Sequence, residues 1–378
     1  MAASVALMFG CGTPANDLAD SRTPDGSPTM VPVDSVVLEE RGDDYLAIAS
    51  GLTVDSSTGE LIVADAVSKK VIQFAPTGAL DTVIGRGGDG PGEFKSPIAT
   101  LRLPGGGLAV SDMGRDVLVL FDSGHSEVGR VPTAGIPYSL AAGGGDTILM
   151  GRMSRQPPYT SVLAVSTTSG DQRATVMAPQ TYAAFSQMRV LHPYFSVTRT
   201  PTHLVVGYSG SNILRDSVAN APILSFRIPA VNRRPLPENL NELFSKPITD
   251  SATAGMGSIL TWMFALPNER LAAVHMDYLL RGRSLEASGW ISIVDLHGRR
   301  ACVDAVLPFH GMGKPQMASR GDTLFVLEQR ATTGNDPVAL VFKYAIDDTG
   351  CVWRDLEEVG PEVAITPGSF AATLPTPD

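Results

Sequence analysis

The chain has 378 residues, of which 43% are hydrophobic and 18% charged, and its formal net charge is −10. That hydrophobic share excludes a globally disordered chain. The acidic excess disfavours duplex nucleic acid as a partner, because the longest basic clusters are only pairs such as Arg233-Arg234. The 38 Gly and 28 Pro residues favour many turns and short strands over long helices.

The N-terminal segment predicts the cellular location of the protein. Residues 1–11 form an apolar run that ends in Gly10-Cys11, and a polar, proline-rich tract follows to residue 32. This resembles the end of a bacterial lipoprotein signal, which implies export, lipidation of Cys11, and a place at the outer membrane or in the periplasm. No basic residues precede the apolar run, so an exported protein without an anchor, or a cytosolic protein with an incidental cysteine, stays open. We expect residues 1–32 to be signal end and disordered linker, and membrane contact to be through the anchor only.

Six turn-and-strand units recur along the chain. In each unit a polar or glycine-containing turn is followed by an aliphatic residue that opens a short hydrophobic strand. The opening residues, spaced 40 to 67 positions apart, are Leu61, Leu108, Ile148, Leu204, Leu271 and Leu324. A four-stranded propeller blade requires roughly 40 to 50 residues. The repeat therefore predicts an all-β fold over residues 33–360, a six-bladed β-propeller of four-stranded antiparallel blades.

The first two units display whole blades. Strands are predicted at 48–54, 61–65, 71–74 and 81–84, and again at 98–103, 108–112, 117–121 and 127–131. A Val-x-Asp sequence followed nine residues later by Phe occurs in both units, as Asp65 with Phe74 and Asp112 with Phe121.

The connection between these two units carries a family resemblance. Residues 85–97 read GRGGDGPGEFKSP and lead into a strand and then Val-x-Asp, which resembles the NHL repeat. The glycines permit positive φ in this loop. Phe94 is expected to fill the wedge between the two blades, and Pro97 to start the inner strand at an end where no ladder donor is lost. The resemblance is specific over residues 48–131, and the later blades share only the pattern.

Both ends of the propeller can also be anticipated. Residues 34–48 parallel an outer strand and its loop, so this N-terminal strand is predicted to complete the last blade and remove an open edge. The segment Cys351–Leu356 competes for the same place. An insert at about 230–258 has helical spacing over 235–244, as a surface decoration or as a lid over one face. Residues 361–378 are predicted to be a disordered tail.

The ends of the six second strands supply the candidate site. Aligning the units places polar residues at one rim of the central channel. These are Asp65, Asp112, Arg152, Tyr208, His275 and Glu328. Mixed charge in one concave place suits a zwitterionic or sugar-like ligand, with Arg152 as a planar donor. The alternative is that each residue braces the loops of its own blade, as Asp does in NHL repeats.

Motifs for chemistry are absent. The sequence has no HExxH, GxSxG or EF-hand ladder, and its three cysteines form no CxxC pair. His275 with Asp277 is a weak base motif, so we predict no catalytic residues, no metal and no cofactor. We expect a monomeric envelope scaffold that binds a protein or a small polar ligand. The alternative is a propeller enzyme of lactonase or lyase type with its site at the channel mouth.

The two C-terminal cysteines offer a possible disulfide. Cys302 and Cys351 each follow the turn after a third strand, at equivalent places in the last two blades. Export would permit oxidation, but the outer strands of neighbouring blades diverge, and bridged Cα atoms must lie within roughly 7 Å of each other. The pair is therefore a hypothesis that depends on how close the two segments come.

Overall fold

The described part of the chain is all-β. The computed structural model describes residues 23–133, 135–153, 160–167, 170–177, 195–208, 212–218, 222–233, 253–281, 284–309, 312–331 and 337–359. Within these ranges the only helical element is a single 3-10 turn, η1 (Pro104–Gly106). No helix in them is long and apolar enough to cross a membrane. The predicted helix at 235–244, Cys11 and the predicted tail lie outside these ranges.

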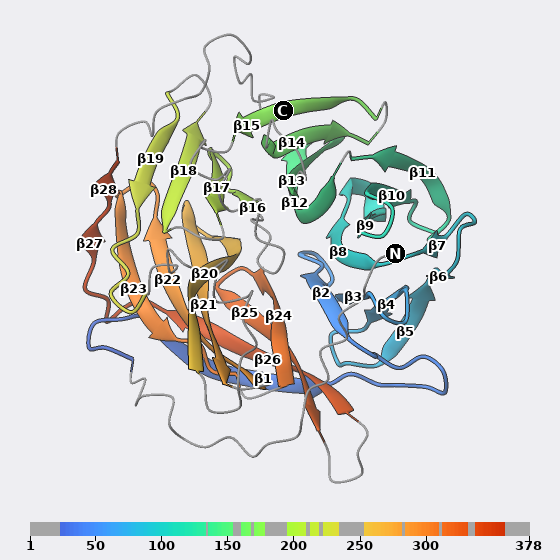
Figure 1. The fold of residues 1–378 in the computed structure, drawn as a ribbon, viewed down its shortest axis with the longest axis horizontal. Coiled ribbons are helices and arrows are strands. Elements are labelled where there is room, and N and C mark those ends of the chain that lie inside the picture. The colour runs from blue at the N-terminus through green and yellow to red at the C-terminus, as the bar shows by residue number, and fades with distance from the viewer. Residues whose placement is uncertain are drawn as a thin grey trace.

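The strands form small antiparallel sheets arranged as a β-propeller (Figure 1). In the described residues four sheets have four strands, two have five, and one ribbon has two. The β2 sheet contains β2 (Ala49–Val54), β3 (Leu61–Asp65), β4 (Lys70–Phe74) and β5 (Leu80–Ile84). The β8 sheet contains β8 (Pro97–Arg102), β9 (Leu108–Asp112), β10 (Val117–Phe121) and β11 (Glu127–Pro132). The parallel ribbon pairs β6 (Arg86–Gly87) with β7 (Glu93–Phe94).

Four more sheets continue the ring in chain order. The β12 sheet contains β12 (Ile136–Gly144), β13 (Thr147–Met153), β14 (Thr160–Ser166) and β15 (Gln172–Met177). The β16 sheet contains β16 (Phe195–Arg199), β17 (His203–Tyr208), β18 (Ile213–Val218), β19 (Leu224–Arg227) and β28 (Glu357–Glu358). The β20 sheet contains β20 (Thr253–Leu266), β21 (Arg270–Arg281), β22 (Ser284–Asp295), β23 (Arg300–Val306) and β27 (Arg354–Asp355). The β24 sheet contains β24 (Met312–Arg320), β25 (Thr323–Ala331), β26 (Pro337–Asp347) and β1 (Thr29–Val37).

The first strand of each sheet lies beside the first strand of the next, and β24 lies beside β2, so the ring closes. The closure is the one predicted from the sequence, because the N-terminal strand β1 pairs antiparallel with β26 in the last sheet. The strand begins at Thr29, however, earlier than the boundary expected at residue 33. Residues 29–32, expected in the linker, pair with the long strand β26 and therefore belong to β1.

The C-terminal segment departs from the expectation. It does not compete with β1 for the last sheet; instead β27 pairs with β23 and β28 pairs with β19. The β20 and β16 sheets are therefore five-stranded, not four-stranded as predicted. Both outer strands would otherwise offer an unpaired edge, and the short C-terminal strands cover part of each.

The core between the β2 and β8 sheets confirms the predicted wedge. Phe94 is fully buried in a cluster that draws on both sheets, and its ring centroid lies 5.8 Å from that of Phe121. Gly85 has φ +72°, and a Cβ there would lie 2.4 Å from the Phe94 ring. The turn thus needs glycine for its backbone and for the space that Phe94 occupies. As predicted, Pro97 begins β8.

Candidate functional site: the central cavity

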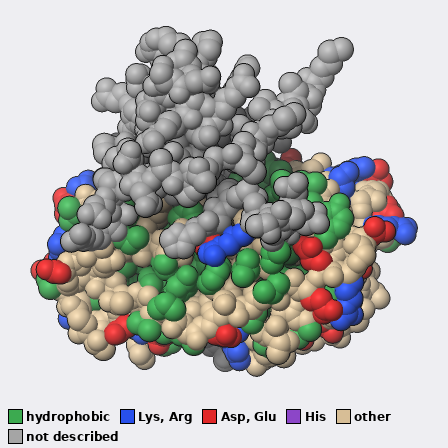
Figure 2. All heavy atoms as spheres, turned by 90° about the horizontal axis from the view of Figure 1, so that it is seen from below, with side chains coloured by type: hydrophobic (Ala, Val, Ile, Leu, Met, Phe, Trp, Pro, Cys, Tyr) green, Lys and Arg blue, Asp and Glu red, His purple; other side chains and the backbone are tan. Residues whose placement is uncertain are grey.

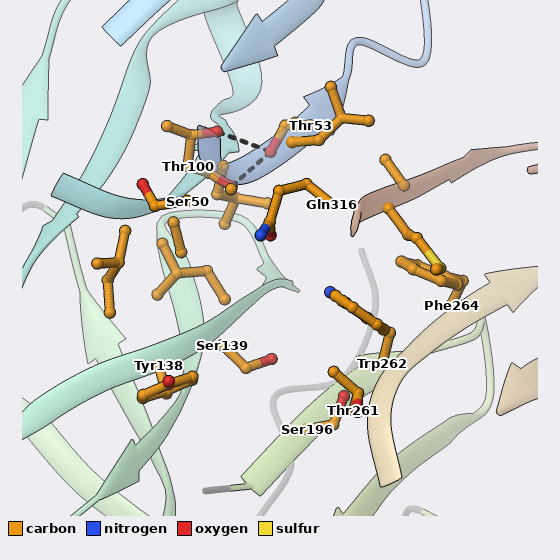
Figure 3. Close-up of a pocket in the computed structure, with 18 of the residues that line it drawn as sticks. Ser50, Thr53, Thr100, Tyr138, Ser139, Ser196, Thr261, Trp262, Phe264 and Gln316 are labelled. Carbon is orange, nitrogen blue, oxygen red and sulfur yellow. Dashed lines mark hydrogen bonds between the residues drawn. The ribbon is translucent and has the colours of Figure 1, made fainter. Parts of the chain in front are cut away.

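The ring encloses a cavity of about 790 Å³. Its wall comes mainly from the first strands of the sheets, namely β2, β8, β12, β16, β20 and β24, and its close-up is shown in Figure 3. These strands lie side by side around the axis, and runs of consecutive residues on each of them line the cavity. Segments from residue 47 to residue 329 therefore meet in one place, at a size suited to a small ligand.

One corner of the wall, from β20 and β24, carries the bulkiest polar and aromatic groups. Trp262 and Phe264 lie two residues apart on β20, and Lys314 and Gln316 lie two residues apart on β24. The Lys314 Nζ lies 4.7 Å from the centroid of the Trp262 ring, a cation–π distance. Trp262 and Gln316 extend toward the middle of the cavity (Figure 3). We call these four residues the cation corner.

The opposite wall, from β2, β8 and β12, consists of aliphatic and hydroxyl side chains together with Tyr138. Its hydroxyls join neighbouring strands: Thr53 donates to the Thr100 carbonyl oxygen at 2.7 Å and accepts from the Thr100 hydroxyl at 2.8 Å (Figure 3). The strands are close enough that a Cβ at Gly51 would come 2.4 Å from the Ile98 carbonyl oxygen. Some hydroxyl groups of this wall therefore form hydrogen bonds that hold neighbouring strands of the ring together.

Similar contacts join other sheets at the cavity. The Val197 N–H donates to the Ser139 hydroxyl at 3.2 Å, and Ser319 donates to the Ala265 carbonyl oxygen at 3.3 Å. Gln329 spans the closure of the ring, donating to the Leu46 carbonyl oxygen at 2.9 Å and accepting from the Ala49 N–H at 3.2 Å. A ring built this way is held at its inner edge by hydrogen bonds as well as by apolar packing.

The electrostatic character of the cavity follows from its lining. Among the described lining residues no side chain is Asp, Glu or His, and Lys314 is the single one with a formal charge. Lys314 is exposed to the cavity, yet the walls remove enough water to lower its pKa to about 8. Burial also raises the pKa of the Tyr138 hydroxyl. Within the described ranges no group of three His, Cys, Asp or Glu side chains is placed to hold a metal ion.

The six predicted rim residues lie one strand outward, on the second strands of their sheets, and the five whose side chains the structure describes do not line the cavity. Asp65 is fully buried and accepts hydrogen bonds from backbone N–H groups, among them Ala47 at 2.6 Å and Val67 at 2.9 Å. Asp112 is also fully buried and accepts from Lys95 at 2.9 Å and from Ser96 at 2.8 Å. Each carboxylate ties its own strand end to the loop from the preceding sheet, which is the bracing alternative.

The other four predicted residues also lie on the second strands of their sheets. Arg152 donates to the Thr133 carbonyl oxygen at 3.1 Å, and partial burial lowers the pKa of its guanidinium. His275 is 2% exposed and lies inside β21, and Glu328 is 3% exposed and paired with Arg330 at 3.0 Å.

The last of these four, Tyr208, ends β17 opposite Phe195, and its side chain lies outside what the structure describes. For the five rim residues with described side chains, the second strand stands behind the first strand that lines the cavity.

The wall residues carried a signal that the sequence interpretation did not use. Trp262 with Phe264, and Lys314 with Gln316, have the two-residue spacing of one face of a strand. These four residues lie on the first strand of their units, before the turn that opens the second strand. A comparison of the six first strands places them together at the channel.

The two C-terminal cysteines are bonded. The Cys302 and Cys351 Sγ atoms lie 2.07 Å apart and their Cα atoms 5.7 Å apart. The approach is possible because the segment after Cys351 runs along β23 in the same sheet as Cys302, instead of closing the last sheet. The Val352 N–H donates to the Gly26 carbonyl oxygen at 2.7 Å, so the N-terminal segment passes here too.

Known proteins resemble this one in fold. No protein-family profile matches the chain, and no curated protein matches it in sequence. Its structure is similar to a member of the DUF4221 family from Bacteroides vulgatus, with a TM-score of 0.61, 8% identity, and coverage of 89% of this chain and 100% of that chain. It is also similar to a Bacteroides fragilis protein named as a proposed exported protein, with a TM-score of 0.54, 12% identity, and coverage of 86% and 97%. These similarities show a shared propeller fold.

Proposed function

We propose that this protein is an exported β-propeller that binds a small ligand in its central cavity. The observation that carries the proposal is the cavity of about 790 Å³, walled by the first strand of every sheet in the ring. Pockets of about 300 to 1,000 Å³ with mostly apolar walls and a few polar groups are typical of small-molecule sites. The ring is proposed to be six-bladed, each sheet of four or more strands counting as one blade.

The fluorescent neutral probe N-phenyl-1-naphthylamine tests this function. We expect it to bind the purified protein once per chain, and Ala99→Phe to weaken binding at least tenfold because the new ring projects from the β8 wall. Val128→Phe on exposed β11 is the matched control, since it adds the same ring away from the cavity. Equal binding by the two folded variants would place the probe elsewhere and contradict the proposal.

The envelope location is proposed from three observations. Gly10-Cys11 ends an apolar run, a disulfide joins Cys302 to Cys351, and a protein of similar fold is named for export. Disulfides persist in oxidising compartments outside the cytosol. We expect the wild-type protein in the membrane fraction and the Cys11→Ala variant in the soluble exported fraction. Recovery of both in the cytosol would overturn the location.

A binding role accounts for the cavity wall better than the alternative of a lactonase- or lyase-type enzyme. Such an enzyme would need a general base or metal ligands at the cavity. None of the described wall residues is Asp, Glu, His or Cys, so they supply no such metal ligand, and a base among them would have to be Lys314 or Tyr138.

A further inference from the structure

An aromatic pair on β20 is only partly covered by other residues. Trp262 and Phe264 are half-buried, whereas Thr261 and Met263, which alternate with them, are each 5% exposed. Alternation along a strand turns the two aromatic side chains to one face, and both line the cavity (Figure 3). The uncovered surface of this pair is therefore surface that a ligand in the cavity can cover.

The opposite wall adds aliphatic surface. Ile98 of β8 and Leu140 of β12 are half-buried, and Ile48, directly before β2, is 52% exposed. All three residues line the cavity. Covering such side chains with an apolar ligand removes them from water, which is favourable in proportion to the area covered.

Several hydroxyl groups of the described wall are engaged within the ring. The five that donate to other atoms of the protein are Ser50, Thr53, Thr100, Thr261 and Ser319. The Ser50 hydroxyl, for example, lies 2.8 Å from the Pro97 carbonyl oxygen and joins β2 to β8. A hydroxyl has a single proton to donate, so these five groups offer a ligand no donor while the contacts of the ring are kept.

A ligand with many polar groups fits this wall poorly. Each hydroxyl or ionised group that leaves water needs a hydrogen-bond partner, and burial without one is unfavourable. The ammonium of Lys314, the one formal charge of the described wall, already has a partner in the Trp262 ring, whose centroid is 4.7 Å away. The wall therefore argues against the zwitterionic or sugar-like ligand expected from the rim residues.

We propose that the cavity binds a neutral, largely apolar ring compound, with a ring against Trp262 and Phe264 and further apolar surface against Ile98 and Leu140. This inference rests on the proposed function and deepens it by naming the class of ligand. Two half-buried aromatic side chains on one strand offer surfaces against which a ring packs in offset-stacked or edge-to-face geometry.

A matched pair of probes tests the class of ligand. Cyclohexyl phenyl ether and phenyl β-glucoside both join a phenyl group through oxygen to a six-membered ring, but only the glucoside carries sugar hydroxyls. Displacement of N-phenyl-1-naphthylamine from the purified protein measures both affinities. We expect the ether to bind at least about tenfold more tightly, because it covers apolar wall and leaves no hydroxyl without a partner.

The position of the ring is tested at Trp262. Trp262→Ser should weaken binding of the ether at least about fivefold, and Trp262→Phe should stay within about twofold of wild type because it keeps an aromatic face. Trp353→Ser is the matched control, since the Trp353 ring also carries a cation, Arg300 at 4.8 Å, but does not line the cavity. The control variant should bind the ether as the wild type does.

Tryptophan fluorescence gives a readout that a purely structural role of Trp262 would not change. The three tryptophans of the chain are Trp262, Trp290 and Trp353, and of these only Trp262 is among the described wall residues. Bromocyclohexane is a neutral ring whose heavy atom quenches fluorescence on contact. It should quench the wild-type protein and Trp353→Phe, but not Trp262→Phe.

Two results separate this inference from the proposed function. If N-phenyl-1-naphthylamine binds but the glucoside binds as tightly as the ether, or Trp262→Phe is quenched like the wild type, the inference is overturned and the proposed function stands. If neither N-phenyl-1-naphthylamine nor the ether binds, the proposed function fails and this inference with it.

Discussion

The β2 and β8 sheets differ from the β20 and β24 sheets in how their second strands end. β3 and β9 have five residues and stop at Asp65 and Asp112, whose carboxylates bind the adjoining loops. β21 has twelve residues and runs six positions past His275, and β25 runs three past Glu328. The same place in the repeat is thus a strand end in one region and strand interior in the other.

The cavity shows the same division. The short-stranded sheets contribute aliphatic and hydroxyl side chains, whereas the long-stranded sheets contribute the cation corner. On the side of the ring formed by β1 and β26, hydrophobic side chains gather over the middle of the face (Figure 2), and Val31, Val33 and Val37 of β1 are exposed. Sheets with the same strand order therefore place different side chains, with different roles, at equivalent positions.

Removing the strand-end carboxylates gives the largest expected effect. Asp112→Ala leaves the Lys95, Ser96 and Gly114 N–H groups without their acceptor, and we expect a loss of about 3 kcal/mol in the free energy of unfolding. Glu328→Ala should cost less, about 1 kcal/mol, because Arg330, one of the groups that interact with it, is 36% exposed and can be hydrated. Urea denaturation measures both, and equal losses would erase the distinction between the regions.

A smaller effect is expected at two arginines that cross between sheets. Arg102 pairs with Asp55 at 2.8 Å and Glu60 at 2.9 Å, and Arg270 pairs with Asp322 at 2.6 Å and with Asp348. Both arginines are 16% exposed, but Asp55 is 8% exposed and Asp322 is 46% exposed. Arg102→Met should therefore cost about 2 kcal/mol and Arg270→Met under about 1 kcal/mol. The reverse order in thermal or urea unfolding would show that the β20–β24 junction is the tighter one.

Acid should reduce this difference between the two arginine variants. Burial alone would raise the pKa of Asp55, but hydrogen bonds from Ser57 and Thr58 and the Arg102 guanidinium outweigh it and hold the pKa well below its usual range. A depressed carboxyl pKa stabilises the fold above the unfolded pKa of about 4, and this stabilisation is lost as pH falls through the folded value. The gap between wild type and Arg102→Met should accordingly shrink in acid, and a gap independent of pH would assign it to packing.

The sequence by itself determined the units that repeat. The strands between residues 48 and 131 have the predicted bounds to within a residue or so, and Phe94, Pro97 and the closure through residues 34–37 behave as expected. These features are local or periodic: turn residues, two-residue alternation and a glycine with φ +72° leave a direct trace in the order of amino acids.

Tertiary structure decided the site and the C-terminal path. Whether Glu328 or Gln329 contacts the ring closure depends on the register of one strand against its neighbours. The meeting of Lys314 with Trp262 depends on two sheets lying side by side, and the Cys302–Cys351 bond depends on which outer edge the last strands cover. Sequence patterns carry the shape of each blade, but contacts between blades are set by packing around the ring.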